Sequence, residues 1–346
     1  MNRAIGKILS LLIAFAIIFT LPTVVVAKEQ DDSHKNPELT TEQDSLSLMT
    51  EKEVEAFWDK LYREAEVAVT PEMIAEAQRF IDEEEQFYAN LTPEKLWEGY
   101  LDENPEIFEQ RLSRNKLLEI KKEIDALYET IVCSNNRTSY LNAKRAYGRY
   151  FSEQDGLTII ARSAIELIGS EALTYAKETF PNDMWKEDAF RHYIWNFNCV
   201  KALAVGITQN GRLNSTRIYT TNYELVNNLL RRNVIPRTNQ PTATELAIAL
   251  NLRNNSFFNR TYSQWNLLFD GVTNPSYGSG RDELMDLWNN ERGREDGVSS
   301  GIFDNPLTLF NNRWNANTVI KSNSTIDVSE TRRLHIWSNN WYVPVR

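Results

Sequence analysis

An aspartate, a histidine and an asparagine recur at four-residue intervals near the middle of the chain. They are Asp188, His192 and Asn196, and Trp195 lies beside them. On an α-helix this spacing places all three on one face. A carboxylate one turn from an imidazole can raise its basicity and orient it, as a general base requires. The alternative is that the same trio joins neighbouring helices as a buried hydrogen-bond network.

A second group with the same spacing lies further along the chain. It consists of Asp286, Asn290 and Arg294, with Asn289 next to Asn290. The planar guanidinium of Arg294 is suited to holding an anionic group. Gly293 is typical of a helix C-terminus, so the alternative is that Arg294 caps exposed carbonyls or pairs with Asp286.

These two groups resemble an uncharacterised bacterial domain family, found in secreted proteins and at the ends of modular toxins. Its signature runs Asp-Ala-Phe-Arg-His-Ala-x-Trp-Asn, then Ala-His-Glu, then Asp-x-x-Asn-Asn-x-x-Gly-Arg. The residues of this chain that fit the first and last blocks are 188–192, Trp195, Asn196, Asp286, Asn289, Asn290, Gly293 and Arg294. The resemblance covers roughly residues 150–300, and it implies a polar site more than it implies a substrate.

The middle block of that signature departs from the family in this chain. Aligned in order, residues 220–224 keep the glutamate as Glu224, but Tyr223 stands where the family has histidine. Glu224 can act as a second carboxylate and Tyr223 can donate a hydrogen bond, but neither replaces a neutral imidazole as a metal ligand. The resemblance therefore implies either chemistry with one histidine or a loss of activity.

Other familiar catalytic motifs do not occur in the sequence. It has no Gly-x-Ser-x-Gly elbow, no phosphate-binding Gly-x4-Gly-Lys-Ser/Thr loop and no His-Glu-x-x-His pair. Its two cysteines and three scattered histidines also argue against a structural zinc site. We assign no metal ligands and no cofactor from the sequence. Export would permit one disulfide between Cys133 and Cys199, and the sequence leaves this pairing open.

Helical signals that would position these groups extend over most of the chain. Thr70-Pro71, Thr92-Pro93 and Asn104-Pro105 each predict a helix start, because a capping side chain precedes a proline at the first helical position. Residues 157–168 are almost continuously apolar, which is typical of a buried central helix. The predicted fold class is therefore mainly α, a multi-helix orthogonal or antiparallel array with a short β-hairpin or extended C-terminal tail.

Further helices are predicted at 188–205, 221–232, 242–253, 262–269 and 281–292. The segments between them are rich in turn-forming residues, so Asn210-Gly211 is predicted to lie in a loop. Gly169-Ser170 is predicted to interrupt or kink the central helix.

Five segments of the chain follow from these patterns. Residues 1–27 form a predicted signal peptide, because Arg3 and Lys7 precede a short apolar run that ends in small residues. The alternative is an uncleaved anchoring helix. Residues 28–48 are polar and form a flexible leader. The remainder divides into an N-terminal helical region at 49–135, a motif-bearing helical domain at 136–312 and a strand-like tail at 313–346.

The composition indicates a globular, acidic protein. The chain has 346 residues with Lys+Arg 38, Asp+Glu 48 and a formal net charge of -10. Such a charge argues against binding to nucleic acid. We expect a protein that is secreted or located in the cell envelope, with no nucleic-acid partner and no stable membrane span after signal cleavage. The sequence does not define its oligomeric state.

Two functions are consistent with the motif residues. In the first, the protein is a hydrolase with one polar cleft: His192 is oriented by Asp188 and activates water, Glu224 or Asp286 assists as an acid or holds a metal, and Arg294 stabilises negative charge. The other predicted substrate-binding residues are Trp195, Asn196, Tyr223, Asn289 and Asn290. The substrate would be an envelope component, an ester or a phosphodiester. In the second, the protein is a non-catalytic extracellular or envelope-associated interaction protein, and the same residues form a structural network.

Overall fold

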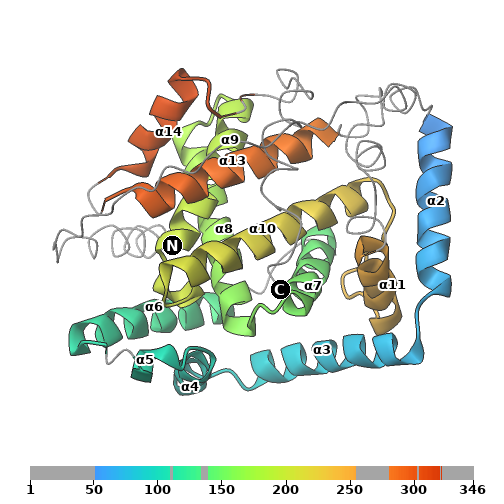
Figure 1. Cartoon of the computed structure of the whole chain (residues 1–346), viewed down its shortest axis with the longest axis horizontal. Helices are drawn as coiled ribbons and strands as arrows, with labels where there is room; N and C mark the ends of the chain where they lie inside the picture. The colour runs from blue at the N-terminus through green and yellow to red at the C-terminus, as the bar shows by residue number, and fades with distance from the viewer. Residues whose placement is uncertain are drawn as a thin grey trace, which may run out of the picture.

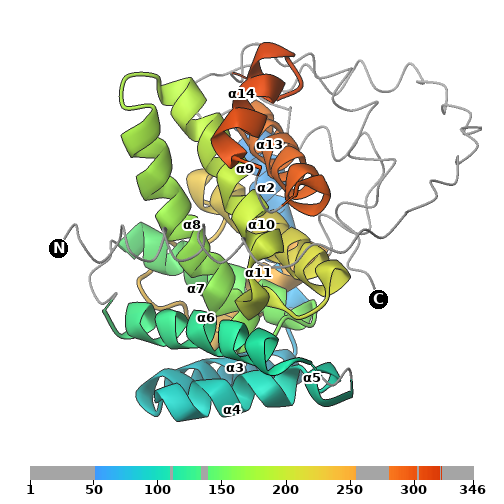
Figure 2. The same cartoon turned by 90° about the vertical axis from the view of Figure 1, so that its left-hand side faces the viewer.

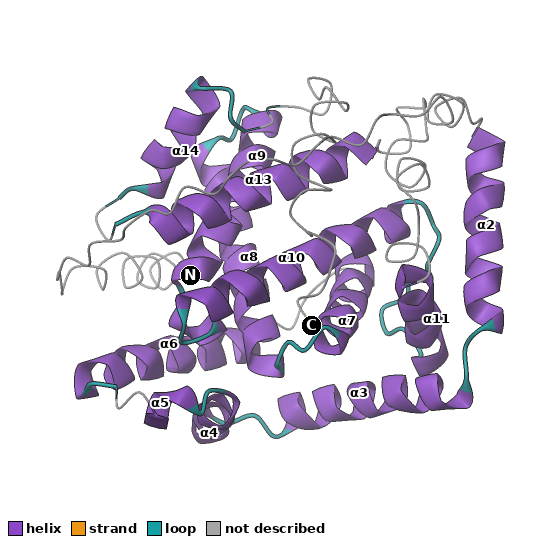
Figure 3. Cartoon of the chain, viewed as in Figure 1, coloured by secondary structure: helices purple, strands orange, loops and turns teal. Residues whose placement is uncertain are grey.

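The structure is a computed structural model that describes residues 51–109, 112–133, 139–254, 280–301, 304–319 and 321, and every regular element in these ranges is a helix (Figure 3). The first half contains α2 (Glu51–Val67), α3 (Pro71–Ala89), α4 (Pro93–Glu103), α5 (Glu106–Glu109), α6 (Arg114–Cys133) and α7 (Ser139–Gln154). The second half contains α8 (Ile159–Thr179), α9 (Met184–Lys201), the 3₁₀ helix η3 (Leu203–Val205), α10 (Gln209–Arg231), α11 (Ala243–Arg253), α13 (Gly280–Ser299) and α14 (Pro306–Asn315). The mainly α fold class is therefore confirmed.

Side-chain caps explain where two of the early helices begin. Thr70 accepts a hydrogen bond from the Met73 N–H at 3.3 Å, and Thr92 accepts one from the Lys95 N–H at 3.2 Å. A proline follows each threonine at the start of the helix, as the sequence predicts. At the third predicted start the short α5 begins directly after Pro105, as predicted, but Asn104 is the C-cap of α4 and its side chain donates to the Tyr100 carbonyl at 2.8 Å.

The helices form two hydrophobic cores that share one long helix. The first core lies among α2, α3, α7 and α11, and the second lies among α4, α6, α8 and α9. Helix α10 contributes Leu225 and Leu229 to the first core and Tyr219 to the second. In two views α3, α4 and α6 lie along one side of the molecule, and α9, α13 and α14 lie along the opposite side (Figures 1 and 2). Helices of the N-terminal region therefore share a core with helices of the motif-bearing region.

Helix α13 lies closely against α9, and two glycines permit this approach. A Cβ atom on Gly293 would lie 2.1 Å from the carbonyl oxygen of Tyr193, and one on Gly297 would lie 2.1 Å from a methyl carbon of Val200. Both glycines are inside α13, so the interpretation of Gly293 as a helix end was wrong. The pattern was ambiguous, because glycine serves both as a C-cap and as a point of close backbone contact.

Two other predicted interruptions are continuous helix in the structure. Helix α8 runs through Gly169-Ser170. Helix α10 begins at Gln209, so Asn210-Gly211 lies in its first turn rather than in a loop. Thr208 caps this turn by accepting the Gly211 N–H at 2.9 Å. The cap extends α10 toward its N-terminus and lets it reach both cores.

Several predicted segments lie outside the described residues, namely the signal peptide at 1–27, the leader at 28–48, the helix at 262–269 and the tail from 322 onward. The first residues of the predicted tail, 313–315, belong to α14. No helix in the described ranges has both the length and the apolar character needed to cross a bilayer. Cys199 is a buried free thiol, so it forms no disulfide.

Candidate functional site

Three helices bring the predicted acid–base residues to one imidazole ring. Helix α9 carries Asp188 and His192, α10 carries Glu224, and α13 carries Asp286. These three helices all pack against one another. The four-residue spacing in α9 and the close glycine contact with α13 therefore assemble the four side chains, which we call the His192 cluster.

The Nδ1 side of the His192 ring faces Asn290 and Glu224. Nδ1 lies 3.1 Å from Asn290 Oδ1 and 3.7 Å from Glu224 Oε1. The amide nitrogen of Asn196 donates to the same Asn290 oxygen at 2.6 Å, which identifies that atom as an acceptor. Nδ1 therefore carries a proton and donates it to Asn290 Oδ1, and this bond orients the ring.

The Nε2 side of the ring faces two carboxylates and a guanidinium. Nε2 lies 2.9 Å from Asp286 Oδ1 and 3.9 Å from Asp188 Oδ1. Arg191 Nη2 lies 2.5 Å from Nε2 and 2.5 Å from Asp188 Oδ1. The sequence predicted that Asp188 orients His192, but Asp188 pairs with Arg191, and Asp286 on the neighbouring helix is the closer carboxylate. Arg191 also lies within the first motif, but no catalytic or binding role was predicted for it from the sequence.

The His192 cluster has a buried floor and a partly exposed rim. His192 has no exposed surface, and the side chains of Glu224 and Asp286 are 1% and 7% exposed. The side chains of Asp188 and Arg191 are 31% and 25% exposed. Solvent therefore reaches the cluster at Asp188 and Arg191, and the histidine lies beneath this rim rather than in an open cleft.

Part of the buried floor lacks hydrogen-bond partners. Glu224 Oε1, Asp286 Oδ1 and Asn290 Nδ2 are buried atoms without a hydrogen bond. The 2.9 Å contact between Asp286 Oδ1 and His192 Nε2 is close, but it is not aligned as a hydrogen bond. An unpaired buried polar group costs about 1–3 kcal/mol, so native proteins rarely keep one without a reason. Such atoms are typical of places where a protein binds an ion, a water or a substrate.

A buried lysine that the sequence analysis did not assign adjoins the His192 cluster. Lys144 Nζ on α7 lies 4.0 Å from Glu224 Oε2 and 3.6 Å from the centre of the Tyr223 ring. Lys144 is 6% exposed and occupies the same face of α7 as the core residues Tyr147 and Phe151. This position was a usable signal, because lysine is almost never fully buried unless it is paired.

Burial and neighbouring charges shift the pKa values of these groups. Burial raises the pKa of Asp286 to about 6, and the charge of Glu224 adds to this rise while His192 opposes it. Burial lowers the pKa of Lys144 to about 8 against the attraction of Glu224. For His192, burial and Arg191 act to lower the pKa, but Asp286 and Glu224 outweigh them and raise it above its ordinary value. Perturbed groups of opposite sign in one place are typical of functional sites.

Arg294 and Asn196 form a bonded support beside the His192 cluster. Arg294 Nη1 donates to Asn196 Oδ1 at 2.6 Å and to Thr220 Oγ1 at 3.1 Å, and its Nε donates to Glu291 Oε2 at 2.9 Å. Arg294 is 1% exposed. The sequence suggested an anion-binding group, a helix cap or a partner of Asp286, but the structure pairs Arg294 with Glu291. Its guanidinium therefore holds α9, α10 and α13 together.

Of three more predicted substrate-binding residues, Trp195 and Asn289 lie in the packed interior and Tyr223 is partly buried. Trp195 is buried, and its indole N–H donates to the Ile165 carbonyl at 2.8 Å. Its ring makes an edge contact with Tyr223, with ring centres 5.2 Å apart. Asn289 is completely buried on α13. Trp195 and Tyr223 thus join α8, α9 and α10, and Tyr223 also provides the aromatic face over which Lys144 lies.

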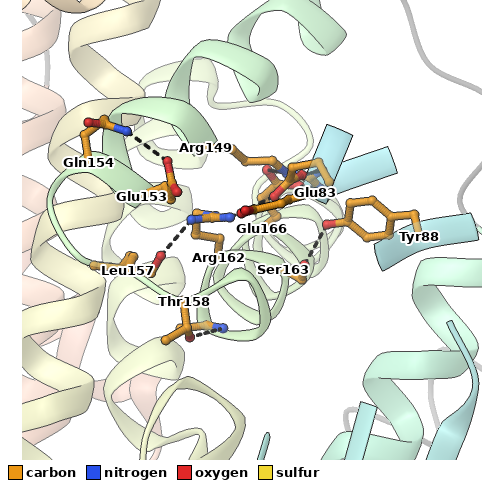
Figure 4. A network of polar contacts seen from close by, with 12 residues as sticks. Glu83, Tyr88, Arg149, Glu153, Gln154, Leu157, Thr158, Arg162, Ser163 and Glu166 are labelled. Carbon is orange, nitrogen blue, oxygen red and sulfur yellow. Dashed lines mark hydrogen bonds and ion pairs between the residues drawn. The ribbon is translucent and has the colours of Figure 1, made fainter. Parts of the chain in front are cut away.

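A second buried polar cluster joins α3, α7, α8 and α10, and Figure 4 shows its members Arg149, Arg162 and Glu166. Arg149 donates to the two carboxylate oxygens of Glu166 at 2.7 and 2.6 Å and to Glu84 Oε2 at 3.0 Å. Arg162 donates to Glu84 Oε1 at 2.8 Å, and the Tyr219 hydroxyl donates to Glu166 Oε1 at 2.5 Å. We call these five residues the Glu166 network. Arg162 Nε has no hydrogen bond, but every carboxylate oxygen of the network has one.

A cavity of about 440 Å³ borders the Glu166 network. Its wall includes Phe80, Phe87, Glu84 and Arg162. None of the site residues predicted from the sequence lines it. This cavity and the His192 cluster are therefore separate features of the fold.

Comparisons with known proteins do not identify the chain or its site. The chain matches no protein family, no curated protein and no solved structure. The resemblance to the bacterial domain family stays a prediction that rests on the motif residues. The functional argument therefore depends on the His192 cluster itself.

Proposed function

We propose that this protein is a hydrolase whose reaction centre is the His192 cluster. The observation that carries the proposal is the convergence of three carboxylates on one imidazole, with an oxygen on two of them, Glu224 and Asp286, left without a hydrogen bond. Incompletely paired ionisable groups are typical of sites for binding and proton transfer. The exposed rim at Asp188 and Arg191 connects these groups with solvent.

The Nε2 side of His192 is the proposed place for the nucleophilic water. A water bound there would lie between the carboxylates of Asp188 and Asp286, which can accept its protons. When the water oxygen bonds to an electrophilic carbon or phosphorus, one water proton passes to the carboxylate of Asp188 or Asp286. The bond between that carbon or phosphorus and the leaving oxygen then breaks, and the leaving oxygen takes up this proton. Arg191 at the rim supplies positive charge where negative charge develops on the substrate. The proposed substrates are esters or phosphodiesters, including envelope components.

The N-terminal sequence supports an exported location for this activity. Residues 1–27 have the charge, apolar run and small residues of a signal peptide. We propose that the mature protein acts outside the cytoplasm, as a secreted or envelope protein. Sequencing the N-terminus of the protein recovered from its native host tests this, and a mature chain that begins near Lys28 is expected.

A second function is favoured by the burial of His192. Its ring has no exposed surface, and the neighbouring Asn196 and Arg294 are bonded to protein partners. Under this alternative the cluster stabilises helix packing, and the protein is a non-catalytic extracellular or envelope-associated interaction protein.

An activity assay on charge-removing variants separates the two functions. Asp286→Asn and Glu224→Gln keep side-chain size, and under the hydrolase proposal each lowers kcat/KM for ester or phosphodiester substrates by roughly 10²-fold. Glu166→Gln is the matched control, because it alters a buried carboxylate in the Glu166 network and leaves the specific activity of folded protein unchanged. Turnover that survives both cluster substitutions contradicts the hydrolase proposal. If the wild type shows no turnover and Asp286→Asn and Glu224→Gln lower the Tm, the second function is favoured.

A further inference from the structure

We infer that Asp188, His192 and Asp286 bind a divalent transition-metal cation of the zinc or manganese class. One ligand atom from each residue lies within 4.8 Å of the other two. Carboxylate oxygens and imidazole nitrogens are common ligands of these cations, and a site with three protein ligands leaves positions open for water. The metal would serve the proposed hydrolase by activating that water, but its binding can be measured without turnover.

In the neutral ring of His192, Nε2 is the nitrogen that can act as a metal ligand once Arg191 Nη2, which lies 2.5 Å from it, has moved away. Nδ1 donates to Asn290 Oδ1 at 3.1 Å, so the neutral ring presents its lone pair at Nε2. A hydrogen bond from the second ring nitrogen to an oxygen is the usual support of a metal-bound histidine. Glu224 Oε1 lies on the same Nδ1 side at 3.7 Å and favours a proton there.

The unpaired oxygen of Asp286 is an independent observation that points to a cation. Asp286 is 5% exposed, and its Oδ1 has no hydrogen bond although it lies 2.9 Å from Nε2. When the ring is neutral, the oxygen and the nitrogen lone pair repel each other at this distance, and Arg191 Nη2, which lies 2.5 Å from Nε2, offsets the repulsion without bonding to Oδ1. A metal ion bound to both atoms removes the repulsion and provides the missing partner for Oδ1.

Arg191 places a positive charge at this position. Its Nη2 lies 2.5 Å from both Asp188 Oδ1 and His192 Nε2, so a guanidinium nitrogen lies between two of the proposed ligands. The Arg191 side chain is 25% exposed and can rotate toward solvent. Arg191 and the metal therefore compete for the same ligands, and Arg191, once displaced, is free to hold an anionic group near the cation.

Isothermal titration calorimetry with ZnCl2 and with MnCl2 tests the site in the chelator-treated mature chain, prepared without a histidine tag. We expect one equivalent of metal to bind. Asp188→Asn and Asp286→Asn each weaken binding by at least ~10-fold, because each removes a ligand. Arg191→Met binds more tightly than the wild type, because the competing cation is gone. Glu166→Gln, the control, binds like the wild type.

Two results would overturn the inference. The first is that neither metal binds to the wild type or to Arg191→Met at millimolar concentrations. The second is equal affinity in the wild type and Asp286→Asn, which would place the ions on acidic surface groups. Circular dichroism of each metal-free variant distinguishes lost affinity from lost fold, and Asp188→Asn alters a partly exposed residue that the fold tolerates.

The failure of this inference and the failure of the hydrolase proposal can be told apart. Ester or phosphodiester turnover in a protein that binds neither metal contradicts the metal site and leaves the hydrolase proposal intact, whereas metal binding as expected without turnover contradicts only the hydrolase proposal.

Discussion

The His192 cluster and the Glu166 network are both buried, both charged and both assembled from several helices, but they differ in how completely they are bonded. In the Glu166 network every oxygen of the two carboxylates accepts a hydrogen bond. In the His192 cluster Glu224 and Asp286 each keep an oxygen without one. Complete bonding is what a packing network requires, since each unpaired buried group destabilises the fold.

The pKa values of the two regions differ in the same way. Burial acts to raise the pKa of Glu166, but the charge and hydrogen bonds of Arg149 outweigh it and lower the pKa below its usual value. Burial raises the pKa of Asp286 to about 6, because His192 compensates for the lost solvation only in part. Burial is therefore common to both regions and does not distinguish them. The pairing of their carboxylate oxygens does.

The largest effect on stability is expected from Glu166→Gln. The substitution removes the carboxylate that accepts two hydrogen bonds from the buried guanidinium of Arg149 and leaves it only the single bond to Glu84, and breaking a buried ion pair from one side costs about 3–5 kcal/mol. Urea denaturation followed by circular dichroism measures the loss. Glu64→Gln is the control, because its pair with Lys60 is exposed at the surface and such pairs contribute about 0–1 kcal/mol. A loss for Glu166→Gln no larger than that of the control would contradict the structural role of the network.

A smaller loss of stability, which affects the region of the His192 cluster, is expected from Gly293→Ala. The new Cβ would lie 2.1 Å from the Tyr193 carbonyl oxygen, so α13 has to move away from α9. Overpacking of this kind costs about 1–3 kcal/mol, and it separates Asp286 from His192. Gly148→Ala on α7 is the matched control, because its Cβ would meet the Tyr223 ring at an ordinary 3.7 Å. Urea denaturation of both variants checks this, and equal stabilities would mean that α13 adjusts without strain.

The sequence predicted the helices and their faces better than it predicted the contacts between helices. Thr70-Pro71 and Thr92-Pro93 marked helix starts, because capping is a local interaction between a side chain and the next turn. The four-residue spacing correctly placed His192 and Asn196 on one buried face of α9. These features depend only on residues close in sequence, so a single chain reveals them.

The parts that the sequence did not predict depend on tertiary contacts. Nothing local shows that Asp286, from another helix, lies closer to His192 than Asp188 does, or that Arg294 pairs with Glu291. The glycine at 293 was interpreted as a helix end because its close contact with α9 has no local signal. Complete bonding and unpaired oxygens are likewise properties of the assembled fold. The residues that form the cluster were therefore predictable, but the distances between them were not.

Glu123 on α6 is a third carboxylate that can be compared with Glu166 and Asp286. Its partner is a backbone N–H, and it has no ion pair with any residue in the described part of the chain. It accepts the Ala204 N–H at 2.9 Å, and burial raises its pKa to about 7 from an ordinary 4.5. Between these two pH values the folded state binds a proton that the unfolded chain has released. Stability therefore falls as the pH rises from 4.5 to 7 and stays lower above that window.

Glu123→Gln should remove this pH dependence. At pH 8 we expect the variant to be more stable than the wild type by roughly 1–2 kcal/mol, and at pH 4 we expect the two to be similar, because the wild-type side chain is then neutral in both states. Urea denaturation at both pH values measures the difference. Glu119→Gln, on the same helix and partly exposed beside Lys116, is the control. A difference between variant and wild type that does not change with pH would show that Glu123 is ionised in the fold.

The smallest change in stability is expected from Asp286→Asn, the direct counterpart of Glu166→Gln. Both substitutions remove a negative charge from a buried carboxylate and keep its size. Asp286 Oδ1 has no hydrogen bond to lose, and the change also removes repulsion from Glu224 and Asp188. We therefore expect a change of less than about 1 kcal/mol in metal-free protein, well below the loss for Glu166→Gln.

Urea denaturation of Asp286→Asn and Glu166→Gln in the same chelating buffer compares the two regions directly. Equal losses would make the His192 cluster a second packing network, and the interaction-protein alternative would then explain it best. Repeating the measurement with ZnCl2 sharpens the comparison, because a ligand that binds only the folded state raises its stability in proportion to its affinity. Under the proposed metal site the wild type and Glu166→Gln both gain stability with zinc while Asp286→Asn gains much less, because only the last of these lacks the charged carboxylate that the cation would bind.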